Sequence, residues 1–544
     1  MTDNKQQNHN SRMLYTSDSR CRSSVGPDHA MFNLLSHGNN VSYQKVEIIE
    51  SGERLSTKQA ISILLSISFG VGYLFLPLSF FVLHSWISLF LLFFNFVSGI
   101  IAVYMLMDVR AQIPLGTYQE IAYYLSRNRG DIITISIIFL LFFGVNCAMY
   151  LQLLGNFTLQ FITLTIKSIQ HKDYTHDSSD EMYWWSIYAI IIAEALIVLP
   201  LCRVLNYQKF KVLAYPIMAT IIMVFLCLIF ELVFSLQKTL IKADFCLISE
   251  GVAHSFNLPS SEFGVAWANV VPSLCFTFGF QIYMLQVHQA LDKPDVNGKR
   301  GMIIGSITMI VIFVSYFALL LISQFFYEKH VMDYHIIYVY DLIFNAGLTF
   351  EFITQILVII QLFCHLPFIF YITKEQAYIL IDEIQRSSMS RMIDEMRIQK
   401  DKAKKYTLSR HITENGVQDQ DNSIKNNKYE PKQIAVYTQY RLPHMTMNNR
   451  STKVTFWVTF LTIVLIALTQ FQFFMNAVSL FGATCVPLSL YILPGYFFSK
   501  FHYGYDQRKY IAGVLFAAFG LVIIFVYSAL VLYSNANIVQ KQTN

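Results

Sequence analysis

The fold of this chain is decided by one stretch, Gly70-Val71-Gly72-Tyr73-Leu74-Phe75-Leu76-Pro77. It lies within an apolar run, residues 61–83, that is long enough to cross a bilayer. Glycine weakens a helix through its backbone entropy, and proline removes a backbone N–H and crowds the preceding turn. We therefore expect the helix to break here, with protein or a wet cavity around the freed backbone groups. The alternative is that these residues serve close packing or a mild kink.

Composition indicates a membrane protein. The 544 residues are 54% hydrophobic and 14% charged, whereas about 25% of residues are charged in an ordinary soluble domain. A net charge of +5 is too small to indicate nucleic acid as a partner. The eight cysteines show no paired spacing, so neither a disulfide framework nor a zinc site is predicted, and no cofactor is expected.

Eleven apolar segments follow a polar tail, residues 1–56, that is predicted to be disordered because it cannot bury enough surface. The segments are 59–83, 86–108, 132–166, 184–201, 212–236, 264–290, 301–326, 347–372, 454–475, 478–498 and 509–533. They predict an all-α polytopic membrane protein with eleven transmembrane helices, eight within residues 57–372 and three within 454–533. The segment 132–166 is too long for one straight span and is expected to tilt or to extend beyond the bilayer.

Lysine and arginine concentrate in one set of connecting loops, as is typical of the cytosolic side. The N-terminus and the insert 373–453 are therefore predicted to be cytosolic, and the tail 534–544 non-cytosolic. Within the insert, residues 374–405 predict an amphipathic helix and residues 406–450 a disordered tether. The insert is either regulatory or a solvated loop without a specific partner. The membrane is either the plasma membrane or a vacuolar or lysosomal one.

The sixth segment contains a second candidate break, five spans after the first. Pro272 and Gly279 bracket the polar pair Ser273 and Thr277, and Gln281 follows. Transporters with discontinuous helices often repeat a bundle in inverted topology, and their substrate sites lie at the interrupted helices. Half-helix N-termini there attract a carboxylate, and unwound carbonyls coordinate a cation. The spacing of the two breaks therefore favours a pocket at mid-membrane.

Four motifs resemble those of the amino acid/auxin permease family, within the amino acid–polyamine–organocation superfamily. They are Gly70-Val71-Gly72 to Pro77, with Phe75 in place of the family's third glycine; Leu199-Pro200-Leu201-Cys202-Arg203; Phe276-Thr277-Phe278; and Phe481-Gly482-Ala483-Thr484 to Ile492-Leu493-Pro494. The resemblance extends over roughly residues 57–533 and is interrupted by the insert. It implies the leucine-transporter-type five-plus-five inverted repeat with broken helices 1 and 6, and it implies secondary transport of amino acids.

From this resemblance we predict which residues of the pocket contact an amino-acid substrate. The substrate carboxylate should meet the free N–H groups of residues 71–73, and the α-amino group should meet carbonyls of residues 276–279. Tyr73 and Phe276 are expected to close over the side chain. Asn146, in the third span, either lines this cavity or bonds between helices. The candidate substrate-binding residues are Gly70, Val71, Gly72, Tyr73, Phe276, Thr277, Gly279 and Asn146.

The coupling ion is predicted from the eighth span, where no serine or threonine lies near Pro367. The resemblance places His365 at the position of a sodium-binding threonine, facing Ser66. Histidine titrates near physiological pH, so we predict proton coupling or no coupling, with sodium symport as the alternative. A neutral His365 bonded to a backbone carbonyl is equally open. Glu194, within the fourth span, is a candidate for the proton path or for a structural hydrogen bond.

Other classes of function are less well supported. An enzyme is not predicted, because the chain has neither an H-E-x-x-H nor a G-x-S-x-G motif. An amino-acid sensor that signals through the cytosolic segments would use the same pocket and stays as the alternative. Membrane lipid is the remaining expected partner.

Overall fold

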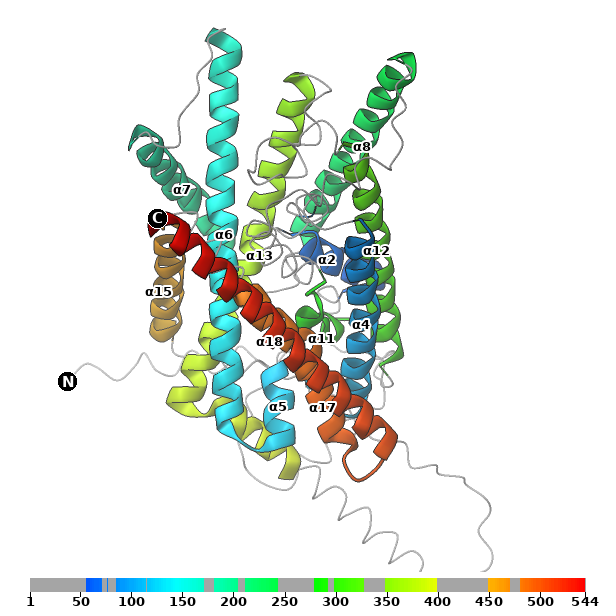
Figure 1. Cartoon of the computed structure of the whole chain (residues 1–544). Helices are drawn as coiled ribbons and strands as arrows, with labels where there is room; N and C mark the ends of the chain where they lie inside the picture. Colours follow the sequence, from blue (N-terminus) through cyan, green and yellow to red (C-terminus); the bar gives the residue numbers. More distant parts are fainter. Residues whose placement is uncertain are drawn as a thin grey trace, which may run out of the picture. The chain divides into compact units, whose positions relative to one another are not determined.

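The computed structural model describes residues 55–70, 76, 85–113, 115–170, 181–203, 211–242, 278–291, 298–326, 348–398, 449–469 and 480–543. Helices make up nearly all of these ranges (Figure 1). The named helices are α2 Thr57–Ser68, α4 Ser85–Gln112, α5 Tyr118–Ser126, α6 Arg129–Gln170, α7 Glu181–Cys202, α8 Lys211–Lys242, α11 Gln281–Gln289, α12 Lys299–Phe326, α13 Leu348–Arg386, α15 Asn449–Ala467, α17 Leu493–His502 and α18 Gln507–Thr543. Residues Leu488–Ile492 form a π-helical turn.

Nine helical stretches within the described ranges are long and apolar enough to cross a membrane. They coincide with nine of the eleven predicted segments. The other two, 59–83 and 264–290, are represented by the short helices α2 and α11. The predicted class, an all-α polytopic membrane protein, is confirmed for these ranges, whereas the count of eleven, the two breaks and the inverted repeat stay predictions.

The helix α6 shows how the long third segment is accommodated. It has 42 residues without interruption (Figure 1). At about 1.5 Å per residue this is about 63 Å, whereas the hydrocarbon core of a bilayer is about 30 Å thick. α6 is therefore long enough to extend beyond the bilayer. α13 packs along it, and α2 packs against α8 and α12.

The helices α17 and α18 approach each other through glycines. A Cβ on Gly513 would lie 2.7 Å from the backbone nitrogen of Ser499, and one on Gly495 would lie 2.7 Å from the carbonyl oxygen of Gly513. Membrane helices have no hydrophobic driving force between them, so small residues that let backbones touch stabilise such contacts. α18 is thereby fixed to α17 although much of its surface is exposed.

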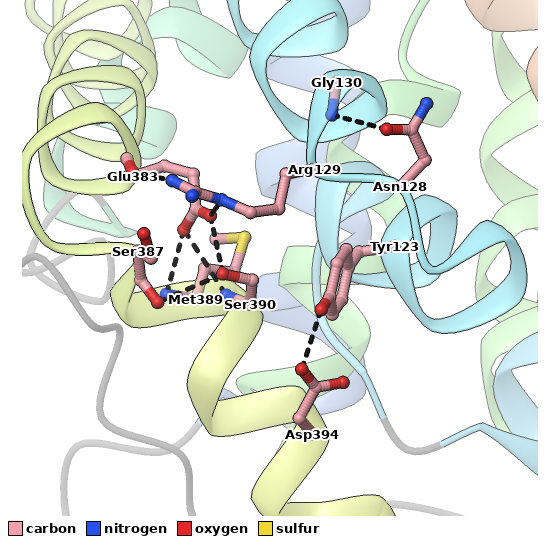
Figure 2. A network of polar contacts seen from close by, with 9 residues as sticks. All are labelled: Tyr123, Asn128, Arg129, Gly130, Glu383, Ser387, Met389, Ser390 and Asp394. Atoms are coloured by element: carbon pink, nitrogen blue, oxygen red, sulfur yellow. Dashed lines mark hydrogen bonds and ion pairs between the residues drawn. The ribbon is translucent and has the colours of Figure 1, made fainter.

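Residues 374–398, part of the predicted amphipathic helix, form two helices rather than one. α13 continues to Arg386, Ser387 takes a left-handed conformation (φ 53°), and residues 388–398 are again helical. The buried Glu383 carboxylate caps this second helix. It accepts hydrogen bonds from the N–H groups of Met389 (3.2 Å) and Ser390 (3.3 Å), and from the Ser390 hydroxyl (2.7 Å) (Figure 2).

The helix 388–398 docks on α5 and on the beginning of α6. Arg129 forms an ion pair with Glu383 (3.1 Å), and the Tyr123 hydroxyl donates to Asp394 Oδ2 (2.8 Å) (Figure 2). Burial and this hydrogen bond raise the pKa of Tyr123 to about 12. An apolar cluster lies beneath these contacts and consists of Tyr123, Ile132, Ile379, Met389 and Ile393.

The helix α5 connects this docked helix to α11. Its first turn has a capping box in which Thr117 and Glu120 bond each other's backbone N–H. Burial raises the pKa of the Glu120 carboxyl, although the N–H groups of Gly116 and Thr117 oppose the shift. At the same end of α5, the Tyr118 hydroxyl donates to the Gln281 carbonyl of α11 (3.4 Å).

Two of the predicted regions, the N-terminal tail up to residue 54 and the insert over 399–448, lie outside the described residues. The helix α18 continues to Thr543 and so includes nearly all of the predicted C-terminal tail, residues 534–544.

Candidate functional site

The helix α2 ends at Ser68, directly before the glycine-rich stretch. Phe69 leaves the helical conformation (ψ 45°), while its N–H still bonds the Leu65 carbonyl at 2.9 Å. The last carbonyl groups of a helix have no partner within it, and inside a membrane each needs one from elsewhere.

Side chains from two other helices supply those partners. The Tyr316 hydroxyl of α12 donates to the Ser68 carbonyl (2.9 Å), and the Gln361 amide of α13 donates to the Phe69 carbonyl (2.9 Å). His365 Nε2, also on α13, bonds the Ser66 carbonyl. We call Tyr316, Gln361 and His365 the carbonyl caps. All three are buried, Tyr316 completely and the other two with 1% of their surface exposed.

Tyr316 also joins the described ends of the first and sixth segments. Its ring packs edge-to-face on Phe69, with centroids 5.5 Å apart, and on Phe278, with centroids 5.7 Å apart. Phe278 begins the turn 278–280 that precedes α11. The two segments predicted to be interrupted therefore meet on one side chain, next to both predicted breaks.

The other ends of α2 and α11 are joined as well. The Leu55 N–H donates to the Ala290 carbonyl (2.9 Å), and Leu55 forms the isolated bridge with Leu291. Arg300, at the start of α12, donates to the Thr57 hydroxyl at 2.7 Å. α2 is thus held to its neighbours at both ends.

The helix α6 closes another side of the site through Tyr150. Its ring stacks on the His365 imidazole, with centroids 5.5 Å apart and planes 26° apart. A Cβ on Gly70 would overlap the Tyr150 hydroxyl and would lie 3.2 Å from the Ile67 carbonyl oxygen. Position 70 therefore requires glycine for close approach, besides any effect on helix continuity.

His365 has a carbonyl oxygen beside each ring nitrogen. Nε2 bonds the Ser66 carbonyl, and Nδ1 lies 3.2 Å from the Gln361 carbonyl oxygen. A neutral imidazole carries one N–H, so only the protonated imidazolium can donate to both oxygens. The geometry accommodates the neutral imidazole with one of these hydrogen bonds and the imidazolium with both.

Ser66 and His365, both predicted to take part in coupling, lie in contact. It is the Ser66 carbonyl that faces the imidazole, because the hydroxyl donates to the carbonyls of Ser62 (2.7 Å) and Ala214 (3.2 Å). Glu194 lies elsewhere, at the contact of α7 with α6, where Thr158 donates to its Oε1. Its Oε2 has no hydrogen-bond partner among the described residues.

The predicted substrate-binding residues are only partly described. Asn146 is buried one helical turn before Tyr150 on α6, and its amide donates to the Phe142 carbonyl (2.9 Å). Gly279 lies in the turn before α11 and is partly buried, and Gly70 follows the end of α2. The remaining ones, Val71, Gly72, Tyr73, Phe276 and Thr277, lie outside the described residues.

Sequence reasoning missed two aromatic residues of the site. Tyr316 and Tyr150 each lie within a long apolar segment, and the only signal was a phenol in an apolar run, which usually finds a hydrogen-bond partner when buried. Gln361 lies within the eighth predicted span, and the sequence predicts no role for it. The partners of all three side chains are distant in sequence, so spacing alone could not reveal them.

The fold and the buried contact define a class: a polytopic helical membrane protein in which two helix ends meet inside the bundle. The sequence profile of one family, described as transmembrane amino acid transporter protein, matches residues 53–540. The chain therefore belongs to the transmembrane amino acid transporter family, and the resemblance noted in the sequence is confirmed.

Comparisons with individual proteins add less. No curated protein sequence matches the chain. Among solved structures, a mutant manganese transporter of Eremococcus coleocola is similar at 11% identity and a TM-score of 0.39, over 92% of this chain and 98% of that one. The same transporter in complex with an aromatic bis-isothiourea substituted compound gives 11% identity and a TM-score of 0.41, with the same coverage.

Proposed function

We propose that this chain is a secondary active transporter that moves amino acids across the membrane by alternating access. Membership of the family supports the substrate class. One observation supports the location of the site: Tyr316 contacts both Phe69, at the end of α2, and Phe278, in the turn before α11. An amino acid has a carboxylate and an ammonium group, and interrupted helices offer free N–H groups to the first and free carbonyls to the second.

The proposed pocket lies between these two helix ends. The carboxylate binds the backbone N–H groups of residues 71–73, and the ammonium group binds carbonyls of residues 276–279. Asn146 and Tyr150 stand on the same face of α6, since they are four residues apart. Tyr150 is in contact with the site through His365, so Asn146 belongs to the same wall.

We further propose that a proton on His365 is the coupling ion. Protonated His365 donates to the carbonyl at the end of α2 and to one in its own helix, and loss of the proton removes one of the two hydrogen bonds. A titratable group in contact with its ring is the Tyr150 phenol on α6. α2 and α8 contribute the hydroxyl and carbonyl groups around Ser66 and Ala214. Glu194 is a second protonatable group, at the α6–α7 contact.

Uptake of radiolabelled amino acids into proteoliposomes tests both proposals. We expect an inward proton gradient to accelerate uptake and an inward sodium gradient to have no effect. His365→Gln, which cannot carry the proton, should abolish the response to pH while leaving exchange of internal for external substrate. His502→Gln is the matched control, because His502 bonds Asp108 (2.8 Å) at the far end of α4 and should leave the response intact.

Three other outcomes would change the assignment. Sodium-driven uptake that is insensitive to His365→Gln would replace proton coupling by sodium symport. Binding of amino acid without flux would favour a sensor that signals through the predicted cytosolic segments. A protein that neither binds nor transports amino acids would end the proposal.

A further inference from the structure

We infer that Tyr316 and Gln361 are positioning residues. Their uncharged hydrogen bonds hold the end of α2 in its substrate-binding geometry. A bound metal cation would be another way to hold the same carbonyl groups. This inference rests on the proposed function. It differs from the role given to His365, because neither Tyr316 nor Gln361 has to exchange a proton.

The carbonyl groups at the end of an interrupted membrane helix are the groups with which transporters coordinate sodium. At the end of α2, the carbonyls of Ser68 and Phe69 each have a side-chain donor at 2.9 Å. A hard cation would have to compete with these donors for the same carbonyl oxygens. The carbonyls are therefore satisfied by the protein itself, and sodium is not needed to order this end of the helix.

The chemistry of the carbonyl caps divides them into two kinds. A phenol has an ordinary pKa near 10 and an amide does not titrate, so Tyr316 and Gln361 keep their N–H or O–H donors throughout the physiological range. An imidazole can gain or lose a proton. The contacts of Tyr316 and Gln361 are therefore independent of pH, and the end of α2 stays anchored at the Ser68 and Phe69 carbonyls whether or not His365 carries its second proton.

Tyr316 has two separable contributions. Its hydroxyl fixes the Ser68 carbonyl, and its ring separates Phe69 from Phe278. Tyr316→Phe removes the first and keeps the second. Because the Gln361 atom that faces the Phe69 carbonyl must be the donor, Gln361→Met removes that donor at similar side-chain length.

Purified protein and proteoliposomes test the inference together. We expect Tyr316→Phe and Gln361→Met each to raise KM for uptake and Kd for binding about tenfold, because each leaves one buried carbonyl without its donor. The maximal rate should stay within about twofold of wild type. Tyr316→Leu, which also removes the ring, should weaken binding further.

The matched control is Tyr491→Phe. This buried hydroxyl lies 3.1 Å from Ser98 Oγ and 3.2 Å from Asn95 Oδ1, so its loss removes two hydrogen bonds between α4 and the π-helical turn without touching α2. We expect Tyr491→Phe to lower the melting temperature about as much as Tyr316→Phe does, with KM and Kd unchanged. A change in KM that is equal in both variants would show a merely structural role and would overturn the inference.

Cation dependence gives a second measurement. The melting temperature and the amino-acid Kd of wild type should be the same in sodium chloride and in choline chloride. Stabilisation or tighter binding in sodium would contradict the inference. If Tyr316→Phe and Gln361→Met bind amino acid as tightly as wild type does, the positioning role is wrong and the proposed function is unaffected. If wild type binds no amino acid, the proposed function itself is wrong.

Discussion

Gly70 lies directly after α2, where there is no space for a side chain. Its α-carbon faces the Tyr150 hydroxyl so closely that a methyl group would overlap it. We predict that Gly70→Ala displaces Tyr150 from the His365 ring and lowers uptake at least tenfold, which radiolabelled uptake would measure. Gly144→Ala is the control, because a Cβ there meets only the Thr373 methyl at 3.8 Å, and it should transport normally. Normal transport by Gly70→Ala would show that the close approach of Gly70 to the Tyr150 hydroxyl is not needed for transport.

Gly70 and His365 show how far residue-level prediction can reach. Both could be found from the sequence, because glycine before Pro77 and a lone imidazole in an apolar span are unusual by themselves. Tyr316 could not be found in this way. Its importance comes from simultaneous contact with Ser68 and Phe278, and a single sequence carries no record of which distant residues become neighbours.

At the scale of elements, the helix 388–398 is predicted to depend on Glu383. Glu383→Ala removes the cap of this helix and the ion pair with Arg129, at a cost of about 1–2 kcal/mol in the docking of the helix. Amide hydrogen exchange within 388–398 should accelerate about tenfold. Glu395→Ala changes an exposed carboxylate on the same helix and should leave exchange unchanged. Equal protection in both variants would mean that the apolar cluster alone docks the helix.

The apolar segments were predictable because hydrocarbon demands long uninterrupted runs of apolar residues. The turn at Ser387 was not. Periodicity over 374–398 continues on both sides of it, and the interruption depends on Glu383 reaching the N–H groups six and seven residues later. Such a capping contact follows from how the segment packs on α5 and α6, rather than from local preference.

At the scale of the whole molecule, the prediction concerns orientation. The distribution of lysine and arginine predicts that the loop between α17 and α18 is cytosolic and that the beginning of α7 lies on the opposite side. Single cysteines at Tyr505 (92% exposed) and Trp185 (74% exposed) should therefore label differently with an impermeant thiol reagent. In intact cells or vesicles with the outer face exposed, Trp185→Cys should react at once and Tyr505→Cys only after permeabilisation. The reverse pattern would invert the topology.

The joined ends of α2 and α11 constrain how the protein can cycle. Leu55 is hydrogen-bonded to Ala290, and Tyr316 touches both Phe69 and Phe278. Under the proposed alternating-access mechanism, we expect these contacts at both ends to make α2 and α11 move together relative to α6 and α13. Spin labels on α2 and α11 would then keep a constant separation through turnover, while their distance to α6 would alternate between two values.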